Sequence, residues 1–418
     1  MDTPPIKQNF FQEMRNVLNP QTATLFAASL ITPAAAFMLY PFLTIYFTHT
    51  LGMSAAEAGM LLSVRFLSSA LLGFIGGWAT ERFGLLRTYV TAGVITAVAI
   101  FVMAFERGVV PLVVILVVMG VSASTVNACV RGLANLAVTS ENRGAVQNYV
   151  HWLNNVGMAI ALPFSADILM GGISNTPFIV TALGYLAMAI LLGVVFRTET
   201  APHSAPSGAK SKGRNWPWQL LTKDRAFAFL MTSFVLWAMV EMQFESNIPL
   251  DLSRHFPAGA HLYGTLGVID MVIVFGLQLV VSRWLATKSS AALSYLGFLM
   301  LGGLIVGGLW QTVVGWTIAI VLLSVGEVFS LGPIMTLMGA LPRDGQQGSY
   351  FALFGMAQGL ATFLAYSLGG IVYQTLHPAV LFTLTLPVAA LSAFFYHKAY
   401  TTHQNRVQRE SAKAAIVG

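Results

Sequence analysis

The sequence predicts an all-α membrane protein in which twelve transmembrane helices form two pseudo-symmetric six-helix bundles, and composition is the first observation behind this prediction. Of the 418 residues, 9% are charged and 56% are hydrophobic, and the mean hydropathy is +0.72. A soluble domain carries about 25% charged residues, so this chain has too few charges to cover a water-facing surface. An ordinary soluble enzyme, a disordered chain and a nucleic-acid-binding module are therefore excluded, and no nucleic-acid partner is expected.

Apolar runs are the second observation. A helix needs about 20 mostly apolar residues to cross the hydrocarbon core of a bilayer. Runs of this kind lie at 24–48, 57–78, 88–105, 111–138, 145–170, 178–196, 226–250, 261–282, 291–309, 315–338, 349–373 and 379–397. Strands of a membrane barrel would alternate polar and apolar residues, whereas stretches such as Val109–Val121 do not alternate. The runs are therefore predicted to be helices.

The placement of Lys and Arg is the third observation. With an even number of spans both termini lie on one side, and 18 of the 22 basic residues fall on that side. Only Arg107 and Arg254 fall on the other side, and Arg65 and Arg131 lie inside spans. Basic residues favour cytoplasmic loops. We therefore expect a multi-pass protein of the bacterial inner membrane with both termini in the cytoplasm.

A polar stretch divides the runs into two sets of six. It is rich in Pro, Ser, Gly and basic residues, which is typical of a flexible linker. Gly144 and Gly348 lie in similar short segments 204 residues apart, which indicates two related halves around a central site. The predicted organisation is a cytoplasmic N-terminal segment at 1–23, a first bundle at 24–196, a cytoplasmic linker at 197–225, a second bundle at 226–397 and a cytoplasmic tail at 398–418.

The loop after the second run has the sequence Gly77-Trp-Ala-Thr-Glu81-Arg82-Phe-Gly84-Leu-Leu-Arg87. It resembles the signature loop of the major facilitator superfamily, with Glu81 in place of the usual aspartate and two leucines in place of the usual basic pair. The resemblance implies a transporter in which Gly77, Glu81, Arg82, Gly84 and Arg87 belong to a cytoplasmic gate. A carboxylate near a helix N-terminus and a salt bridge can form a breakable latch. The alternative is that these charges only anchor a loop.

The resemblance covers the whole chain and is greatest to the twelve-span drug:proton antiporter branch, the MdtH-type exporters. Arg65, sixteen residues before Glu81, the Gly326-Glu327 pair and Pro333 are similar to that branch. Leu116 departs from it, because many members have an arginine there. The resemblance implies proton-coupled export powered by the proton gradient, with no cofactor.

Acidic residues inside the predicted spans mark a candidate proton site, because a charge at the centre of a bilayer costs about 2.5–3.5 kcal/mol or more. Glu241 and Glu245 are four residues apart, which places them on one helix face, and Asn247 and Pro249 after them loosen the backbone. Two neighbouring carboxylates in a low dielectric favour proton binding by one of them. The residues predicted to couple transport to protons are Glu241, Glu245, Asp270 and Glu327. Structural pairing or helix packing is the alternative for each.

A second set of residues is predicted to line a substrate cavity. Arg65 stays charged, so it must pair with an acid or bind an anionic substrate. Polar residues recur every four positions in the fourth and fifth runs, and such stripes bind ligands or join helices. The predicted cavity residues are Arg65, Asn127, Arg131, His151, Asn155, Trp237, Glu241 and Glu245.

Three functions remain open from the sequence. The first is proton-coupled efflux of small amphipathic or drug-like molecules. The second is transport of a specific anionic metabolite, such as a carboxylate siderophore or an organic acid, bound by Arg65 and Arg131. The third is a non-transporting scaffold or an intramembrane enzyme. The enzyme is disfavoured because nucleotide-binding and metalloprotease motifs are absent and Cys129 is the only cysteine, and the scaffold is disfavoured because charged residues are retained inside the spans. We expect a monomer, with protons, lipid and a small-molecule substrate as its partners and with no bound metal.

Overall fold

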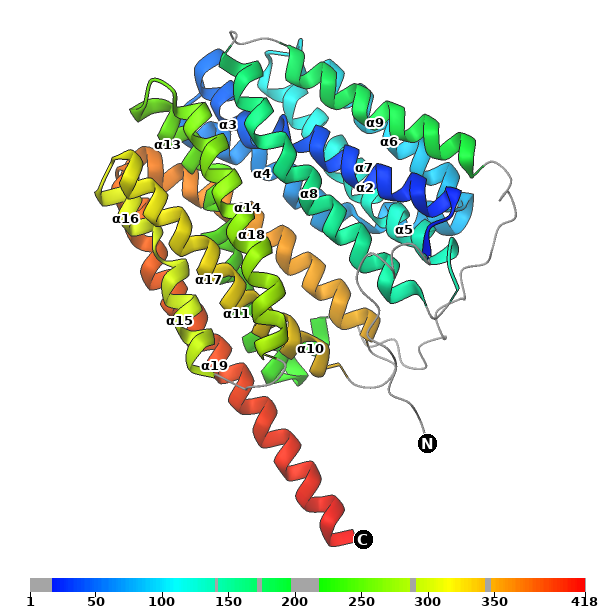
Figure 1. The fold of residues 1–418 in the computed structure, drawn as a ribbon, viewed down its shortest axis with the longest axis vertical. Helices are drawn as coiled ribbons and strands as arrows, with labels where there is room; N and C mark the ends of the chain where they lie inside the picture. Colours follow the sequence, from blue (N-terminus) through cyan, green and yellow to red (C-terminus); the bar gives the residue numbers. More distant parts are fainter. Residues whose placement is uncertain are drawn as a thin grey trace. The chain divides into compact units, whose positions relative to one another are not determined.

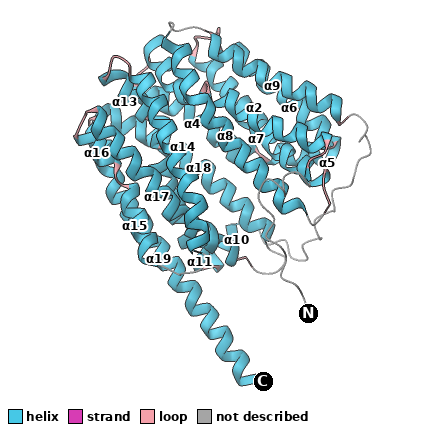
Figure 2. Ribbon diagram, viewed as in Figure 1, coloured by secondary structure: helices cyan, strands magenta, loops and turns pink. Residues whose placement is uncertain are grey.

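A computed structural model describes residues 17–139, 142–170, 175–196, 218–285, 291–342 and 347–417. Every regular element in these ranges is a helix (Figure 2). Ten helical stretches among the described residues are long and apolar enough to cross a membrane. The two other predicted runs, 145–170 and 291–309, are occupied by α8 (Arg143–Met170) and by α15 (Ala291–Leu301) with α16 (Leu304–Leu309). The predicted all-helical membrane fold is therefore confirmed. Residues 1–16 and most of the predicted linker lie outside the described residues.

The chain forms two compact units, and the first contains residues 1–40 and 71–205. Its helices are α2 (Pro20–Phe37), α5 (Phe74–Phe83), α6 (Leu85–Met103), α7 (Val109–Leu136), α8 (Arg143–Met170) and α9 (Thr176–Val195) (Figure 1). Helix α2 packs on α8 and α9, and α6 packs on α7 and α9. The hydroxyl of Thr181 donates to the Ala35 carbonyl at 2.6 Å, and the hydroxyl of Thr96 donates to Ser122 at 2.7 Å. Small hydroxyl side chains thus join neighbouring helices, which suits helix packing in lipid.

The second unit contains residues 41–70 and 206–418. Contacts therefore group residues 41–70, which precede the predicted linker, with the C-terminal part of the chain. The helices of this unit are η1 (Tyr40–Phe42), α3 (Leu43–Ile45), η2 (Tyr46–Thr50), most of α4 (Ala55–Leu72), α10 (Trp218–Lys223), α11 (Arg225–Glu241), α12 (Gln243–Ser246), α13 (Ile248–His255), α14 (Gly259–Leu285), α15 (Ala291–Leu301), α16 (Leu304–Leu309), α17 (Val313–Ala340), α18 (Gln347–Thr375) and α19 (Pro378–Val417). Helix α11 packs on α18 and α19, and α17 packs on α14 and α15.

Two of the three places where the chain passes from one unit to the other lie at or near helix irregularities. The first helical run changes from α-helix to a 3₁₀ turn at Tyr40–Phe42 and then to a π-helix at Tyr46–Thr50. The second run is interrupted at Gly73, between α4 and α5. Irregular helix segments of this kind often occur at hinges. Residues 41–70 are therefore bounded at both ends by positions where a helix can bend.

Helix α4 lies very close to α18 in the second unit. A Cβ atom added at Gly59 would collide with the carbonyl oxygen of Tyr366, and one added at Gly370 would lie 2.6 Å from the carbonyl oxygen of Ala55. The Phe66 and Tyr366 rings are 5.1 Å apart. The absence of side chains at the two glycines thus permits backbone contact between these helices.

The seventh predicted span is a broken helix. Helix α11 ends at Glu241, the short α12 follows, and α13 begins after Asn247 with Pro249 in its first turn. Proline suits the first turn of a helix, where its missing N–H is not needed. The breaks place Glu241 at the end of α11 and Glu245 in α12.

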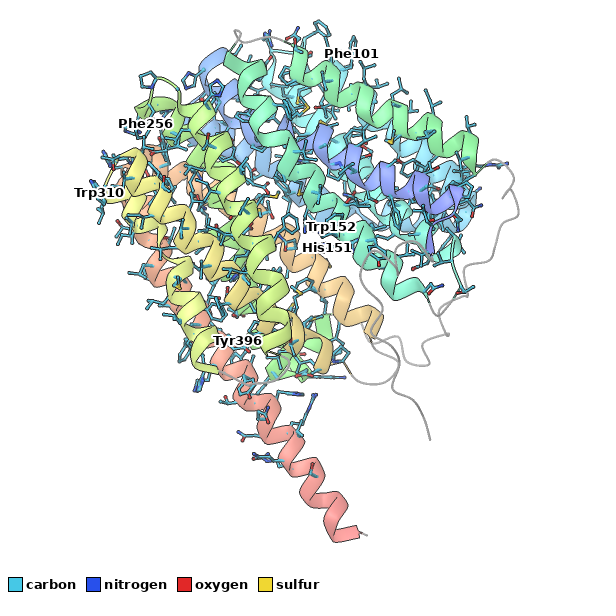
Figure 3. All side chains as sticks on the ribbon, viewed as in Figure 1. Phe101, His151, Trp152, Phe256, Trp310 and Tyr396 are labelled. Carbon is cyan, nitrogen blue, oxygen red and sulfur yellow. The ribbon has the colours of Figure 1, made fainter. Side chains whose placement is uncertain are left out.

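The two ends of the second unit carry different side chains. Figure 3 shows Phe256, after α13, and Trp310, after α16, at one end of the unit, where aromatic residues suit a membrane–water interface. At the other end, α19 continues through the predicted tail to Val417 and extends beyond the neighbouring helices (Figure 1). Arg406 of this extension lies 3.2 Å from the carboxylate of Asp224, which anchors the extension to the start of α11.

Candidate functional site

Four carboxylates from four helices interact inside the second unit. Those of Glu327 on α17, Glu245 on α12 and Asp270 on α14 all act electrostatically on Glu241 at the end of α11. Glu327 is also influenced by Asp270. Each of the four side chains is half-buried. All four residues predicted to couple transport to protons thus belong to one cluster, which we call the acid cluster.

The sequence predicted a pair, Glu241 and Glu245, on one helix face. The structure adds two members from other helices, and Glu327 acts on Glu241 more strongly than Glu245 does. A turn at Met242 separates the helix that ends at Glu241 from the helix that contains Glu245. The four-residue spacing therefore identified Glu241 and Glu245 but not Glu327, the carboxylate that acts most strongly on Glu241.

The charge of Glu245 is partly balanced by Arg65. The guanidinium of Arg65 on α4 acts on the Glu245 carboxylate, and it also lies over the Phe66 ring at 5.1 Å. Both residues belong to the second unit, because α4 up to residue 70 groups with it. The arginine inside the second span therefore has an acidic neighbour, and that neighbour belongs to the acid cluster.

Hydroxyl groups accompany the acid cluster. Ser324 on α17 donates to Asp270 at 2.6 Å, and the hydroxyl of Tyr366 on α18 donates to the backbone carbonyl of Glu245 at 3.4 Å. Tyr263 on α14 is fully buried and is influenced by Glu245, Asp270 and Glu241. Ser324, Tyr366 and Tyr263 were not among the site residues predicted from the sequence. The sequence did contain one signal for Tyr263. It lies seven residues before Asp270, which is two helical turns and places both side chains on the same helix face.

Trp237 occupies a packing position. Its side chain is buried, its indole N–H donates to the Ser330 hydroxyl at 2.7 Å, and its ring stacks on Phe234 with centroids 5.9 Å apart. The hydrogen bond joins α11 to α17. In this conformation the indole N–H is satisfied within the protein, and the predicted substrate contact remains a prediction.

The other predicted cavity residues form a polar stripe on α7 and α8 of the first unit. Asn127, Arg131 and His151 are exposed, and Arg131 acts electrostatically on His151. Asn155 lies 3.5 Å from the imidazole of His151, which Figure 3 labels on α8. Gln147 donates to the Arg131 carbonyl at 2.8 Å. The sequence-predicted residues of this unit thus share one stripe, which offers one cation and several amides.

The loop with the superfamily motif has a local geometry that explains its glycine. Gly84 separates α5 from α6 and has a φ of 84°, which disfavours any side chain. Glu81, Arg82, Gly77 and Arg87 are exposed. The Arg82 guanidinium lies over the Trp78 ring at 5.6 Å, a cation–π contact. The predicted gate role of these residues remains a prediction.

Sequence comparison decides the family. The profile described as Major Facilitator Superfamily matches residues 25–366. The chain belongs to the major facilitator superfamily. Members of this superfamily are membrane transporters and not enzymes, so the chain is an integral multi-pass transporter. Membership of this superfamily also implies that the protein lies in a membrane and transports a small-molecule substrate.

Curated bacterial relatives cover most of the chain. One is the uncharacterized MFS-type transporter YqjV of Bacillus subtilis (strain 168), which is 22% identical over 407 residues, 94% of this chain and 98% of the relative. Another is described as a Na(+), Li(+), K(+)/H(+) antiporter of Planococcus maritimus. It is 24% identical over 371 residues, 80% of this chain and 83% of the relative. Neither assigns the chain to a drug:proton branch, and neither indicates siderophore export.

Solved structures agree on the fold. The peptide transporter POT in complex with sulfate matches with a TM-score of 0.74 at 12% identity, covering 92% of this chain and 94% of that one. The nucleoside transporter NupG matches with a TM-score of 0.68 at 13% identity, covering 91% and 99%. At such low identities the similarity concerns the fold, and the site must be interpreted from this chain's own residues.

Proposed function

We propose that this transporter is a proton-coupled exporter of small amphipathic, drug-like molecules and works by alternating access. The observation that carries the proposal is the acid cluster, in which Glu241, Glu245, Asp270 and Glu327 act on one another inside one unit. Ionisable side chains at membrane depth are costly and commonly mark ion or substrate pathways. Helix packing does not require ionisable side chains, so a cluster of four of them from four helices favours a role in transport.

The charges of the acid cluster suit exchange of a proton for a cation. Neighbouring carboxylates repel one another when all are ionised, and a bound proton or a bound cation relieves that repulsion. The two ligands therefore compete for the same negative charge. An amphipathic cation leaving as protons enter is the exchange that this electrostatic arrangement supports best.

Arg65 supplies a connection between proton binding and movement. It lies on residues 41–70, the segment bounded by the helix irregularities at Tyr40–Phe42 and Gly73. An ionised Glu245 attracts Arg65, and a protonated Glu245 does not. A ligand shifts a conformational equilibrium only when it favours one state over the other. Proton exchange at Glu245 meets that condition, because it changes the attraction between this segment and the rest of the second unit.

The antiporter relative favours a second candidate for the cargo. Its description concerns exchange of Na⁺, Li⁺ and K⁺ for protons, and carboxylates and hydroxyls are the ligands that hard cations prefer. The anionic-metabolite alternative has less support, because Arg65 already has an acidic neighbour.

For the polar stripe of the first unit we retain the role of substrate contact, and for Glu81, Arg82 and Arg87 that of a cytoplasmic gate. We further propose that the two halves are six-helix bundles, that the termini are cytoplasmic and that the protein is a monomer.

Purified protein in liposomes that contain the pH indicator pyranine tests the proposal. Ethidium, NaCl, KCl, LiCl and citrate are added outside in separate experiments, and probe-dependent proton movement is recorded against empty liposomes. Ethidium-dependent proton movement supports export of amphipathic cations. A response to the metal salts alone replaces this cargo with monovalent cations, and a response to citrate alone replaces it with an anion. Uptake of radiolabelled ethidium without proton movement would overturn proton coupling.

A further inference from the structure

We propose that Tyr263 is a positioning residue of the proton site, whose hydroxyl donates a hydrogen bond to the Glu245 carboxylate when Glu245 has released its proton. The inference rests on the proposed proton coupling and assigns a residue that neither the sequence motifs nor the comparisons select. Its basis is the Tyr263 hydroxyl, which is buried and has no hydrogen-bond partner among the described residues, and the electrostatic influence of the Glu245 carboxylate on this tyrosine.

The Tyr263 side chain is enclosed by apolar groups. It has no exposed surface, and its ring contacts those of Phe42 at 5.6 Å and Phe244 at 5.2 Å between centroids. Within the described part of the chain, its hydroxyl has no hydrogen-bond partner. Buried hydroxyls are almost always hydrogen-bonded, because an unpaired one loses its water without compensation. We therefore expect this hydroxyl to have a partner in another state of the transport cycle.

Glu245 is the carboxylate best placed to be that partner. Among the charged groups that act on Tyr263, Glu245 is the strongest, and Asp270 and Glu241 are weaker. Asp270 already accepts a hydrogen bond from Ser324 at 2.6 Å. The Arg65 guanidinium attracts the ionised Glu245 carboxylate. This attraction does not prevent the Tyr263 hydroxyl from donating a hydrogen bond to the same carboxylate. A second donor would favour the ionised carboxylate further.

The pH response of this group depends on every helix that surrounds it. The titratable and charged groups facing the Tyr263–Glu245 pair are Arg65 on α4, Glu241 on α11, Asp270 on α14 and Tyr366 on α18, and Glu327 on α17 acts through Glu241. Tyr366 donates its hydroxyl to the Glu245 carbonyl at 3.4 Å. Tyr263 is therefore the tyrosine of this group whose hydroxyl is available to the carboxylate.

Replacement of Tyr263 by Phe tests the proposal, because the ring packing stays and only the hydroxyl is lost. Transport by the variant in pyranine liposomes should be half-maximal at a higher pH, by about half a unit or more, because ionised Glu245 loses a donor. Thermal stability at pH 5 should not fall, since the proposed hydrogen bond requires a Glu245 that has released its proton. Tyr373→Phe is the control. It removes a bond of 3.0 Å to Asp251 and should lower stability without moving the transport midpoint.

A second measurement separates this inference from the proposed function. The melting temperature of the detergent-purified protein is recorded from pH 5 to pH 9 and requires no transport. Tyr263→Phe should move the pH-dependent part of this curve, and the same change in a Glu245→Gln background should not. An unchanged curve in the single variant, or an equal shift in the Glu245→Gln background, would overturn the role of Tyr263. Absence of proton-coupled transport in the wild type would overturn the proposed function alone.

Discussion

Arg65 of α4 and Glu245 of α12 attract one another inside the second unit, although they are 180 residues apart in the sequence. The arginine belongs to residues 41–70 and the glutamate to the acid cluster. This one relationship joins the segment bounded by helix irregularities to the groups that we propose to bind protons.

A double-mutant cycle measures the Arg65–Glu245 interaction. Arg65→Met, Glu245→Gln and the double variant are compared by thermal unfolding in detergent at pH 7.5. We expect each single variant to destabilise the protein and the double variant to recover part of the loss. The expected coupling is about 1–3 kcal/mol, typical of residues that share an interaction. Purely additive losses would show that the two residues act independently and would remove the link between Glu245 and residues 41–70.

Ser324→Ala tests whether the hydrogen bond from Ser324 favours the ionised form of Asp270. The substitution removes the 2.6 Å hydrogen bond to the carboxylate, and hydrogen bonds to charged groups are worth about 1.5–3 kcal/mol. Loss of this donor disfavours the ionised Asp270, so half-maximal proton-coupled transport should move to a higher pH. Ser367→Ala is the control, because the Ser367 hydroxyl donates to the Phe363 carbonyl one turn earlier in its own helix. An equal shift in both variants would argue against a proton role for Asp270.

Gly59→Ala tests the close contact between α4 and α18. The added methyl group would collide with the Tyr366 carbonyl, and backbone atoms cannot move aside as a flexible side chain can. We expect slower transport and a destabilisation of about 1–3 kcal/mol, as for other overpacked positions. Gly355→Ala provides the control, because a Cβ at Gly355 meets nothing within 4 Å. Normal transport and stability of Gly59→Ala would show that the contact is not needed.

Asp224 anchors the extension of α19. Its carboxylate accepts hydrogen bonds from the backbone N–H of Phe227 at 3.1 Å, the Tyr350 hydroxyl at 2.8 Å and Arg406 at 3.2 Å. Asp224→Ala removes a helix cap worth about 0.5–2 kcal/mol and the anchor of Arg406. The variant should unfold at a lower temperature, and trypsin should cleave the α19 extension faster than in the wild type. Tyr350→Phe should produce a smaller loss of stability, because one of the three bonds disappears. Unchanged cleavage would contradict the anchoring.

The helices could be predicted from the sequence because lipid allows few alternatives. A spanning backbone must satisfy its hydrogen bonds internally, so an apolar run of the right length specifies a helix. Glu241, Glu245, Asp270 and Glu327 could also be predicted as site residues, because an ionisable side chain is energetically costly inside a membrane span. The sequence could not show that they meet, because meeting depends on how α11, α12, α14 and α17 pack.

Other features lay beyond sequence reasoning for physical reasons. Helices α4 and α18 approach each other closely at Gly59 and Gly370, and a glycine in the sequence does not specify which helix will pack against it. Tyr263 resembles many other tyrosines in apolar runs, and only its burial and missing partner distinguish it. Trp237 was selected for its position near the acids, but its hydrogen bond to Ser330 depends on the packing of α11 against α17.

The most direct test of the central claim is probe-dependent proton movement in liposomes that contain Glu245→Gln, Glu241→Gln, Asp270→Asn or Glu327→Gln protein. Glu106→Gln is the control, because Glu106 lies in the loop between α6 and α7 and its carboxylate accepts from the Gly108 backbone N–H at 2.8 Å. Glu245→Gln should abolish proton movement, at least one other variant of the acid cluster should impair it and Glu106→Gln should retain it. Full proton-coupled transport by all four cluster variants would contradict proton coupling through the acid cluster.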